Sequence, residues 1–472
     1  MMRELLADYP PAIARYDEML GAPGKPRSHW QPLFDQLAAT SPEALRERVQ
    51  WVQRQVRDNG VTYNVYADPE GADRPWELDM LPLILPAGEW AGIEAAIKQR
   101  ATLLNQVLVD VYGEQRLLAE GLLPPALVYG HAGFLRPCRG SRPPGGVMLH
   151  MYAADLARSP DGRWWVVDDR TQAPSGAGYA LENRLVISRL YADLFRDLRV
   201  QRLAGFFATL RDSLAHWAPV EGGNAGAGPL TVLVTPGPLN ETYFEHTYLA
   251  RYLGIPLVEG NDLTVREDKV WLKTLTGLQR VHVILRRLDD DFCDPLELRS
   301  DSALGIPGLV QAVRRGHVLV ANGLGSNLLE TGALLGFLPR LCERVLGESL
   351  KMPSVATWWC GEPAALADVT AKLDRVVIKG AYSQMRVEPM FGEDLDERGR
   401  ARVTAMLKAR PQMYVAQELV QLSQAPVCDP QSPTRQLSAS AIGLRVYACA
   451  SPNGYVVMPG GLTRAATGTS RS

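Results

Sequence analysis

The spacing of hydrophobic and polar positions changes along the chain, and the first change separates a helical region from the rest. Apolar residues recur three and four positions apart from Glu89 to Leu118, which is the spacing of one buried face on a long helix. Apolar and polar residues alternate at 60–66, which indicates a short strand. We therefore expect residues 1–137 to form a mainly helical N-terminal region.

A turn-rich segment at 136–146 precedes a change to strand-like patterns. Residues 147–152 and 163–167 read as two strands, and the Ser-Pro-Asp-Gly sequence at 159–162 supplies a turn between them. This arrangement predicts a β-hairpin. A helical pattern follows from Leu181 to Trp217. Residues 138–220 are thus expected to form a hairpin and helix unit.

Strand and helix patterns alternate after a glycine-rich linker at 221–228. The predicted order over 229–350 is strand 230–234, helix 241–253, strand 255–259, strand 281–285, helix 308–315 and strand 317–320. Alternation of this kind is typical of a wound, parallel α/β lobe. The last region, 351–472, has strands at 376–379, 414–418 and 455–458 and a helix at 396–409. Its Pro- and Ser-rich stretch at 425–440 is expected to be a mobile loop. The fold class is therefore α/β, with separate α+β parts.

Composition narrows the class of protein. The chain has 472 residues, 46% hydrophobic and 22% charged, and a formal charge of −2, which fits a globular protein of two or three lobes. No overall basic field favours nucleic acid or an anionic membrane. No apolar run is long enough to span a bilayer and no signal peptide is visible, so we expect a cytoplasmic protein. The six scattered cysteines predict reduced thiols rather than zinc ligands or disulfides.

Three acidic residues flank the predicted hairpin turn. Asp155 precedes the turn, and Asp168 and Asp169 follow it. Since a hairpin brings its two ends together, these carboxylates can converge into the oxygen-only environment that Mg²⁺ prefers. A solvated rim of the hairpin, which is the commoner arrangement for three acidic residues, explains the same sequence.

Two features of the last region suggest contacts with a nucleotide. Lys379 ends an apolar strand, where its ammonium group can neutralise phosphate charge. Gln417 and Glu418 follow a buried strand, where they can approach an adenine edge and ribose hydroxyls. An ordinary snorkelling lysine and an ordinary exit from a strand are the alternatives. The common phosphate loop, dinucleotide-binding glycine motif and hydrolase elbow do not occur.

Several strings of residues occur together in an order that resembles the circularly permuted ATP-grasp family related to glutathionylspermidine synthase. The similarity extends from about Tyr16 to Arg464. Its most specific stretches are WWVVDDRTQAPSGAGYALENR at 164–184, TPGPLNETYFEH at 235–246, LVEGNDL at 257–263, RRLDDDFCDP at 286–295, LGIPGL at 304–309 and MPGGLTR at 458–464.

The resemblance implies a nucleotide between two α+β halves, with the acidic segment before the phosphate-binding lysine. Asp155 and Asp168 match metal-site acids, with Asp169 beside them, and Lys379 matches the lysine that contacts ATP phosphates. Gln417 and Glu418 match the region near adenine and ribose. Arg445 and Arg464 fall in strands that carry phosphate-facing basic residues. The implied chemistry is activation of a carboxylate by Mg²⁺-ATP and amide formation with an amine.

The chain departs from the family pattern at four places. Arg170 stands where many members have asparagine after two acids, and Glu330 is the only acid where an Asp-Asp-Lys string is usual. The glycine-rich cover after the lysine is here 380–384. The terminal segment with Ser-Lys-Asp does not follow Arg464. In many relatives a helical domain follows this module, so the resemblance also implies a helical partner domain.

Two functions remain open from the sequence. The first is an ATP-dependent ligase that acts on a peptide-like or amino-acid-like carboxylate and an amine. The second is a nucleotide-binding or scaffold protein that retains the fold without turnover. Candidate substrate contacts lie at strand ends of the wound lobe, where such folds bind ligands. They are Glu245, His246, Glu259, Arg286 and Arg287. Capping and ion pairing are equally ordinary roles for these residues.

Overall fold

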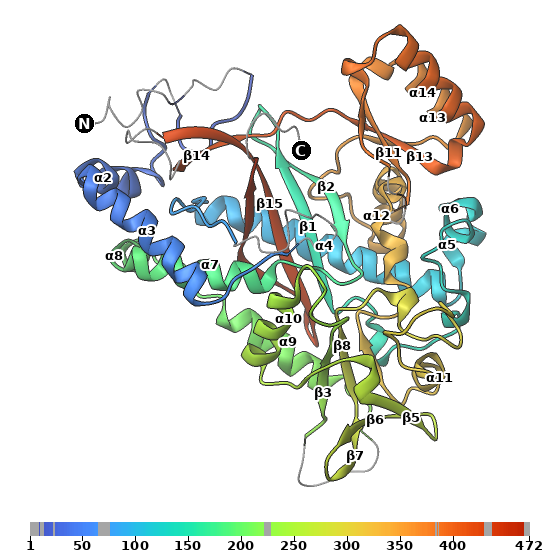
Figure 1. The fold of residues 1–472 in the computed structure, drawn as a ribbon. Coiled ribbons are helices and arrows are strands. Elements are labelled where there is room, and N and C mark those ends of the chain that lie inside the picture. Colours follow the sequence, from blue (N-terminus) through green and yellow to red (C-terminus); the bar gives the residue numbers. More distant parts are fainter. Residues whose placement is uncertain are drawn as a thin grey trace.

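The computed structural model describes residues 9, 14–21, 24–64, 76–220, 228–382, 385, 387–428 and 437–466. Its central sheet is built from two distant parts of the chain (Figure 1). The strands lie in the order β14-β15-β1-β2, and β16 pairs with β15. Their bounds are β1 Met151–Arg158, β2 Trp164–Arg170, β14 Gln424–Cys428, β15 Leu437–Ser451 and β16 Gly454–Ala465. The predicted hairpin is confirmed as the β1–β2 pair.

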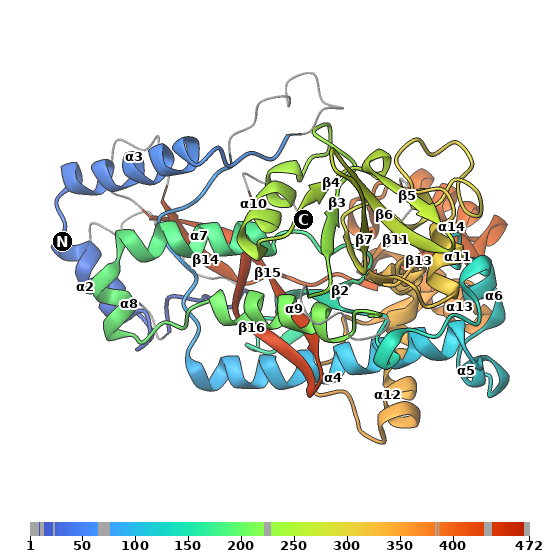
Figure 2. The ribbon, with the colours of Figure 1, turned by 90° about the horizontal axis from the view of Figure 1, so that it is seen from below.

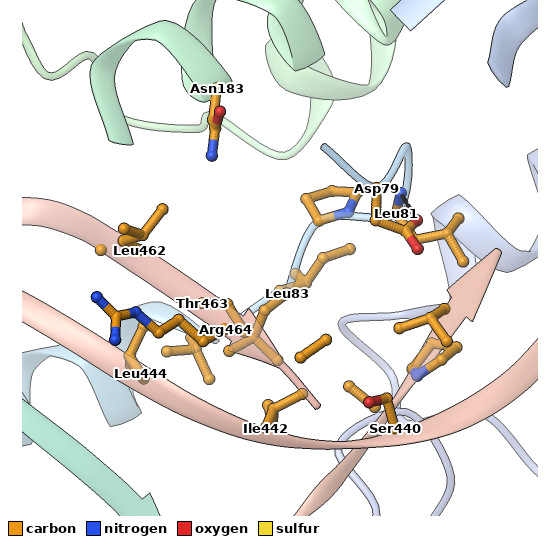
Figure 3. Close-up of a pocket in the computed structure, with 18 of the residues that line it drawn as sticks. Asp79, Leu81, Leu83, Asn183, Ser440, Ile442, Leu444, Leu462, Thr463 and Arg464 are labelled. Carbon is orange, nitrogen blue, oxygen red and sulfur yellow. Dashed lines mark hydrogen bonds between the residues drawn. The ribbon is translucent and has the colours of Figure 1, made fainter. Parts of the chain in front are cut away.

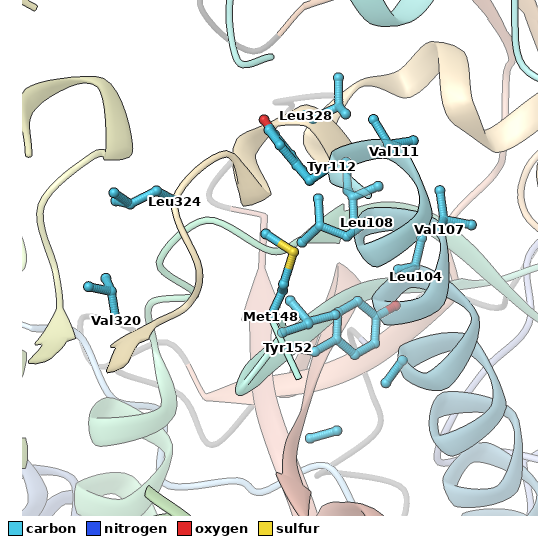
Figure 4. Packing of buried hydrophobic residues seen from close by; sticks show 14 of the residues in the cluster. Leu104, Val107, Leu108, Val111, Tyr112, Met148, Tyr152, Val320, Leu324 and Leu328 are labelled. Carbon is cyan, nitrogen blue, oxygen red and sulfur yellow. The ribbon is translucent and has the colours of Figure 1, made fainter. Parts of the chain in front are cut away.

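Helices cover both faces of the central sheet (Figure 2). Helix α4, Ala87–Tyr112, packs its apolar side against one face, where Leu104, Leu108 and Tyr152 belong to one buried cluster (Figure 4). Helices α7, Ala177–Leu190, and α9, Ala204–His216, cover the other face. The helix predicted at 89–118 is confirmed as α4 and the short α5, Arg116–Ala119. The helix predicted at 181–217 is instead three helices, with α8 at Ala192–Asp197 between α7 and α9.

A second sheet is wholly parallel, as predicted for the wound lobe. Its order is β4-β3-β8-β9. The strands and their connecting helices are β3 Thr231–Val234, α10 Tyr243–Leu253, β4 Leu257–Val258, β8 Val283–Arg286, α11 Leu309–Arg314 and β9 Leu319–Ala321. The chain between β4 and β8 forms an antiparallel sheet that was not predicted. It consists of β5 Leu263–Arg266, β6 Lys269–Thr274 and β7 Gly277–Val281.

A third sheet has the order β10-β13-β11-β12 and carries two helices on one side (Figure 1, upper right). Its elements are β10 Thr357–Trp359, α13 Pro363–Ala371, β11 Val376–Gly380, β12 Met390–Phe391, α14 Glu397–Ala409 and β13 Tyr414–Glu418. The chain just before β10 pairs with the edge of the central sheet: Val166 N donates to Pro353 O at 3.0 Å, and Val355 N donates to Val166 O at 2.9 Å. The third sheet is therefore joined to β2.

The remaining helices lie at the periphery or near α4. They are α2 Gln31–Ala39, α3 Pro42–Asp58, α6 Pro125–Tyr129 and α12 Leu338–Leu346. The strand expected at 60–66 does not form over 60–64, and 65–66 lie outside the described residues. The loop expected at 425–440 is wrong at both ends, because β14 and the start of β15 pair there; 429–436 lie outside the described residues. No helix of the described part is long and apolar enough to cross a membrane.

Candidate functional site

A row of charged side chains crosses three strands of the central sheet. In the strand register, Asp155 of β1 lies opposite Asp168 of β2 on one side and Arg445 of β15 on the other. Side chains at paired positions of neighbouring strands point to the same face. Arg445 donates to both oxygens of Asp155, Nε at 2.6 Å and Nη2 at 2.8 Å, so that the pair is bidentate. The two acids predicted to flank the hairpin turn are therefore brought together.

Arg170 lies among these acids, because residues two apart on a strand share a face. Its Nη2 is 2.7 Å from Oδ2 of Asp168, and its Nε donates to Oδ2 of Asp155 at 3.3 Å. Glu330, at the end of the 3₁₀ turn Ser326–Glu330, accepts the backbone N–H groups of Thr171 and Gln172, each at 2.7 Å. Its charge acts on Arg170 as well. Three carboxylates thus surround one guanidinium group.

The pKa values of the two aspartates move in opposite directions. Burial raises the pKa of Asp168 to about 6, although the charges of Arg170 and Lys379 oppose it. Burial also acts to raise the pKa of Asp155, but the hydrogen bonds and charge of Arg445, with smaller effects of Arg170 and Arg464, hold that pKa below its usual value. Asp155 is therefore a fixed carboxylate, whereas Asp168 is the acid whose charge is poorly compensated.

Lys379 reaches the same region from the third sheet. It lies on β11, and its Nζ donates to Oε1 of Gln417 on β13 at 2.8 Å. Gln417 is 7% exposed, and its Nε2 is 3.3 Å from both Val167 O of β2 and Oγ1 of Thr357. Burial lowers the pKa of Lys379, while the charge of Asp168 raises it. Gln417 therefore holds the lysine at the junction of the two sheets.

Glu418, the next residue of β13, is exposed at the end of the strand. Its N–H donates to Ala356 O at 2.9 Å. Adjacent side chains of a strand point to opposite faces. Glu418 thus lies beside the Lys379–Gln417 pair in sequence but projects from the other side of β13. Its predicted contact with ribose stays a prediction.

Asp169 is not brought to this site, although it was expected to join the metal ligands. It points to the opposite face of β2 and is 2% exposed. Arg100 of α4 donates to both of its oxygens, each at 2.7 Å, and Tyr152 Oη donates at 2.5 Å. Arg100 also donates to Oγ of Ser354 at 3.0 Å, just before the third sheet. Asp169 is therefore a structural partner of α4.

The sequence held a signal for Arg100 that was not used. It falls between Ile97 and Leu104 on the apolar side of α4, and a cation at such a position needs a buried counter-charge. Asp169 supplies it.

Most of the candidate substrate residues have structural partners. Glu245 is fully buried; its Oε1 accepts from Gly176 N at 2.7 Å and Gly178 N at 2.8 Å, and its Oε2 is 3.2 Å from Arg287. Arg287 also donates to Pro174 O. These two residues therefore fix the loop between β2 and α7. In the same loop, the carbonyl of Ser175 accepts a hydrogen bond from Arg445.

The other three candidates also lie in local networks. Arg286 is 1% exposed and donates to the carbonyl groups of Asn322 and Leu288. His246 is bonded to the hydroxyls of Thr235 and Thr242, and burial lowers its pKa to about 2. Glu259 is exposed and caps the turn at Gly260–Asp262. None of the five is placed among the charged side chains around Asp155.

The role of Glu245 can be tested by stability. Glu245→Ala leaves Arg287 buried without its carboxylate, which is expected to lower the free energy of unfolding by about 3–5 kcal/mol. Glu47→Ala, on the exposed side of α3, is the matched control and is expected to change it by less than about 0.5 kcal/mol. Urea unfolding followed by circular dichroism measures both. Equal stability of the Glu245→Ala and Glu47→Ala proteins would show that Glu245 does not brace the loop.

A large cavity lies beside the free side of β16 (Figure 3). Its volume is about 2250 Å³, and its walls come from β16, α7, the segment 77–87 and the chain around β14. Arg464 of β16 lines it, and its side chain makes no ion pair or hydrogen bond within the described residues. Arg184 of α7 also lines it, and its side chain donates to the carbonyls of Gln201 and Pro459. The positive charge of Arg464 also contributes to the lowered pKa of Asp155. The wall of the cavity therefore lies close enough to the row of charged residues to act on it.

Gly460 lies in this wall beside Arg184. Its φ is +147°, and a Cβ atom there would lie 2.2 Å from Nη2 of Arg184. A side chain at position 460 would therefore require the guanidinium of Arg184 to shift.

Asp79 ties the segment 77–87 to β14 at the cavity, and its titration gives a pH prediction. Its oxygens accept from Leu81 N at 2.7 Å and Cys428 N at 2.8 Å, yet burial raises its pKa to about 6. A raised pKa means that the folded state binds the proton more tightly. The contribution to stability is therefore full below about pH 4, the unfolded value, and is lost as the pH rises through about 6.

Asp79→Asn removes this dependence. We expect the difference in unfolding free energy, wild type minus variant, to fall between about pH 4 and about pH 7. Denaturant titrations at several pH values measure it. A difference that stays constant or grows with pH would contradict the assignment.

The contacts of the carboxylates decide whether they can hold a magnesium ion. Their oxygens are of the type that Mg²⁺ prefers, but both oxygens of Asp155 are bound by Arg445, and Oδ2 of Asp168 is paired with Arg170. Within the described residues no group of three or more His, Cys, Asp or Glu side chains is placed to hold a metal ion. As arranged, these residues do not fit a divalent cation bound by them alone.

The comparison with protein families identifies the arrangement. The family model described as circularly permuted ATP-grasp type 2 matches residues 82–466. The chain belongs to this family. The expected resemblance and the permuted order, with the acidic hairpin before the lysine strand, are confirmed.

Similar proteins support the family and extend it. An uncharacterised protein of Synechocystis is 36% identical over 96% of this chain and 92% of its own length. An uncharacterised protein of Mycobacterium tuberculosis is 38% identical over 95% of this chain, which spans 50% of that relative's length. A glutathione synthetase-like effector of Globodera pallida, solved in apo form, has a TM-score of 0.60 and 16% identity, covering 90% of this chain and 95% of that one. This last likeness concerns the fold.

Proposed function

We propose that this ATP-grasp protein is an ATP-dependent carboxylate–amine ligase. The observation that carries the proposal is the approach of Lys379 to Asp168 at the junction of two sheets, where Asp168 lies beside Asp155. Gln417 holds the lysine there, and its Nε2 reaches the backbone of β2. A cation and carboxylates from separate sheets are what a nucleotide bound between two halves requires. The family assignment gives the nucleotide as ATP.

The proposed reaction has two steps. A substrate carboxylate oxygen attacks the γ-phosphorus of ATP, and the bond from that phosphorus to the β–γ bridging oxygen breaks. The products are an acyl phosphate and ADP. An amine then attacks the acyl carbon, the amide bond forms, and phosphate and a proton are released. Lys379 contacts the phosphates and offsets their charge, which is the main protein contribution to phosphoryl transfer. Glu418 is proposed to contact the ribose.

Two arginines are proposed to act on the acyl group. Arg445 is held by Asp155 and Ser175 and is 5% exposed, so it supplies a fixed positive charge at the floor of the site. The side chain of Arg464 has no partner in the described part of the chain, so its guanidinium is free to bind a carboxylate or the acyl phosphate that it becomes. The substrate would therefore enter from the cavity that Arg464 lines.

The size of the cavity bears on the substrate class. A site for a drug-sized molecule occupies roughly 300–1,000 Å³, and this cavity has about 2250 Å³. The volume favours a peptide-like carboxylate over a single amino acid. Arg184 and Arg464, neither paired with a carboxylate among the described residues, favour an anionic group at their part of the wall. Elsewhere the cavity is also lined by acidic residues: Glu77, Asp79, Glu94 and Glu393.

A specific observation favours a second candidate, a nucleotide-binding protein without turnover. Arg170 occupies the space between the acids, where it pairs with Asp155 and Asp168. A cation at this position opposes the arrangement that phosphoryl transfer needs.

ADP release separates the two candidates. The chain is incubated with Mg-ATP and a panel of short peptides and amino acids as carboxylates, with primary amines as acceptors. For a ligase we expect ADP only when both a carboxylate and an amine are present. ATP binding by calorimetry without ADP release across the panel would favour the second candidate. Absence of ATP binding would contradict both.

A further inference from the structure

The charged row contains an internal counter-cation. We propose that Arg170 takes the place of a divalent cation between Asp155 and Asp168 in the nucleotide-free protein, so that the empty site binds no such ion and admits one only together with nucleotide phosphates. The inference rests on the proposed function only in assuming that these carboxylates face a nucleotide.

The contacts of the two acids support the first half of the inference. Arg445 binds both oxygens of Asp155 at 2.6 and 2.8 Å, and Arg170 reaches Oδ2 of the same residue at 3.3 Å. Oδ2 of Asp168 is 2.7 Å from Arg170, while its Oδ1 accepts the N–H of Asp169 at 3.0 Å. Two carboxylates thus face two guanidinium groups. A divalent ion would have to displace one guanidinium group from the carboxylates, and the positive charges of both guanidinium groups would repel it.

Glu330 does not supply the missing ligand in this arrangement. Its Oε1 accepts two backbone N–H groups, from Thr171 and Gln172. That contact fixes the carboxylate to the chain immediately after Arg170, where its charge favours the guanidinium. The third acid therefore strengthens the position of Arg170.

The two arginines differ in their freedom to move. The Arg445 side chain is 6% exposed and is bound at three points, twice by Asp155 and once by Ser175 O. The Arg170 side chain is 36% exposed, and within the described part of the chain it pairs with the two aspartates alone. Phosphate oxygens compete well for a guanidinium group. A bound triphosphate can therefore draw Arg170 away from Oδ2 of both acids. This frees Oδ2 of Asp168 and removes one of the two contacts of Oδ2 of Asp155, whereas Arg445 stays in place.

Mn²⁺ alone is the probe that tests this inference. The nucleotide-free chain is titrated with Mn²⁺, and free ion is measured by electron paramagnetic resonance. We expect no stoichiometric site in the wild-type protein. Arg170→Asn removes the cation and adds a carbonyl oxygen, so it is expected to gain one site per chain that binds at least about tenfold more tightly than any wild-type binding. Adding Asp168→Asn to Arg170→Asn should abolish the gained site.

Arg163→Asn is the matched control. It makes the same change on the same hairpin, at an exposed arginine paired with Asp161, and is expected to behave as wild type. The inference is overturned if the wild-type chain binds one Mn²⁺ without nucleotide, a measurement that does not depend on any variant. It is also overturned if Arg170→Asn, or Arg170→Ser should the first variant not fold, gains no site while circular dichroism shows native structure. Failure to bind ATP would contradict the proposed function and the nucleotide-dependent half of this inference, whereas the Mn²⁺ titration tests the first half independently.

Discussion

Asp169→Asn is expected to destabilise the protein strongly, whereas Asp168→Asn, at the adjacent position of β2, is expected to leave its stability almost unchanged. Asp169→Asn leaves Arg100 buried beside a neutral side chain, and loss of one partner from a buried ion pair costs about 3–5 kcal/mol of stability. The Arg100–Asp169 pair is 2% exposed on both sides. A large fall in the denaturation midpoint is therefore expected.

Asp168→Asn is the internal control for the same chemical change. Burial already disfavours the charge of Asp168, as its raised pKa shows. Its ion pair with the partly exposed Arg170 contributes about 0–1 kcal/mol to stability. Its stability should therefore stay close to that of the wild type. Thermal and urea unfolding of both variants measure the contrast. Comparable losses in the two variants would mean that the two faces of β2 are wrongly assigned.

Lys379→Met is expected to weaken Mg-ATP binding without unfolding the third sheet. A hydrogen bond to a charged group contributes about 1.5–3 kcal/mol, which corresponds to a Kd roughly tenfold to more than a hundredfold higher. Methionine retains the length of the lysine side chain and its packing beside Gln417. Isothermal titration calorimetry with Mg-ATP measures the change.

Lys372→Met is the matched control for this experiment. Lys372 lies in the same lobe but is 57% exposed and pairs with Asp368 across one turn of α13. Its replacement removes the same charge and should leave the Kd unchanged. If both variants lose affinity equally, the effect is one of overall charge, and Lys379 has no specific contact with the phosphates.

Sequence patterns predicted the elements whose signals are local. The β1–β2 hairpin had a clear turn, and the parallel sheet had alternating strand and helix patterns of the right length. The sheet β5–β7 was missed because much of it is exposed, so that polar residues such as Lys269 and Lys273 interrupt its apolar pattern. The long β15 was partly read as a loop, since its pairing partner β14 lies beside prolines that locally favour turns.

The candidate site was predictable only as far as strand geometry extends. Asp155 and Asp168 were correctly expected to meet because a hairpin joins them. Asp169 was misjudged because its partner Arg100 lies 69 positions earlier, on a helix that crosses the other face of the sheet. The hairpin sets Arg170 beside Asp155 and Asp168, but the charge of Glu330 acts on it from a turn that is distant in sequence. Such contacts follow from tertiary packing, which periodicity does not contain.

Hydrogen–deuterium exchange with and without saturating Mg-ATP tests the central claim most directly, because it locates the nucleotide. We expect slower exchange in β2, β11 and β13, the strands that carry Asp168, Lys379 and Gln417, and little change in the distant sheet β5–β7. Protection that is absent from these three strands, or that appears instead in the parallel β3–β8 sheet, would contradict a nucleotide site at the junction of the central and third sheets.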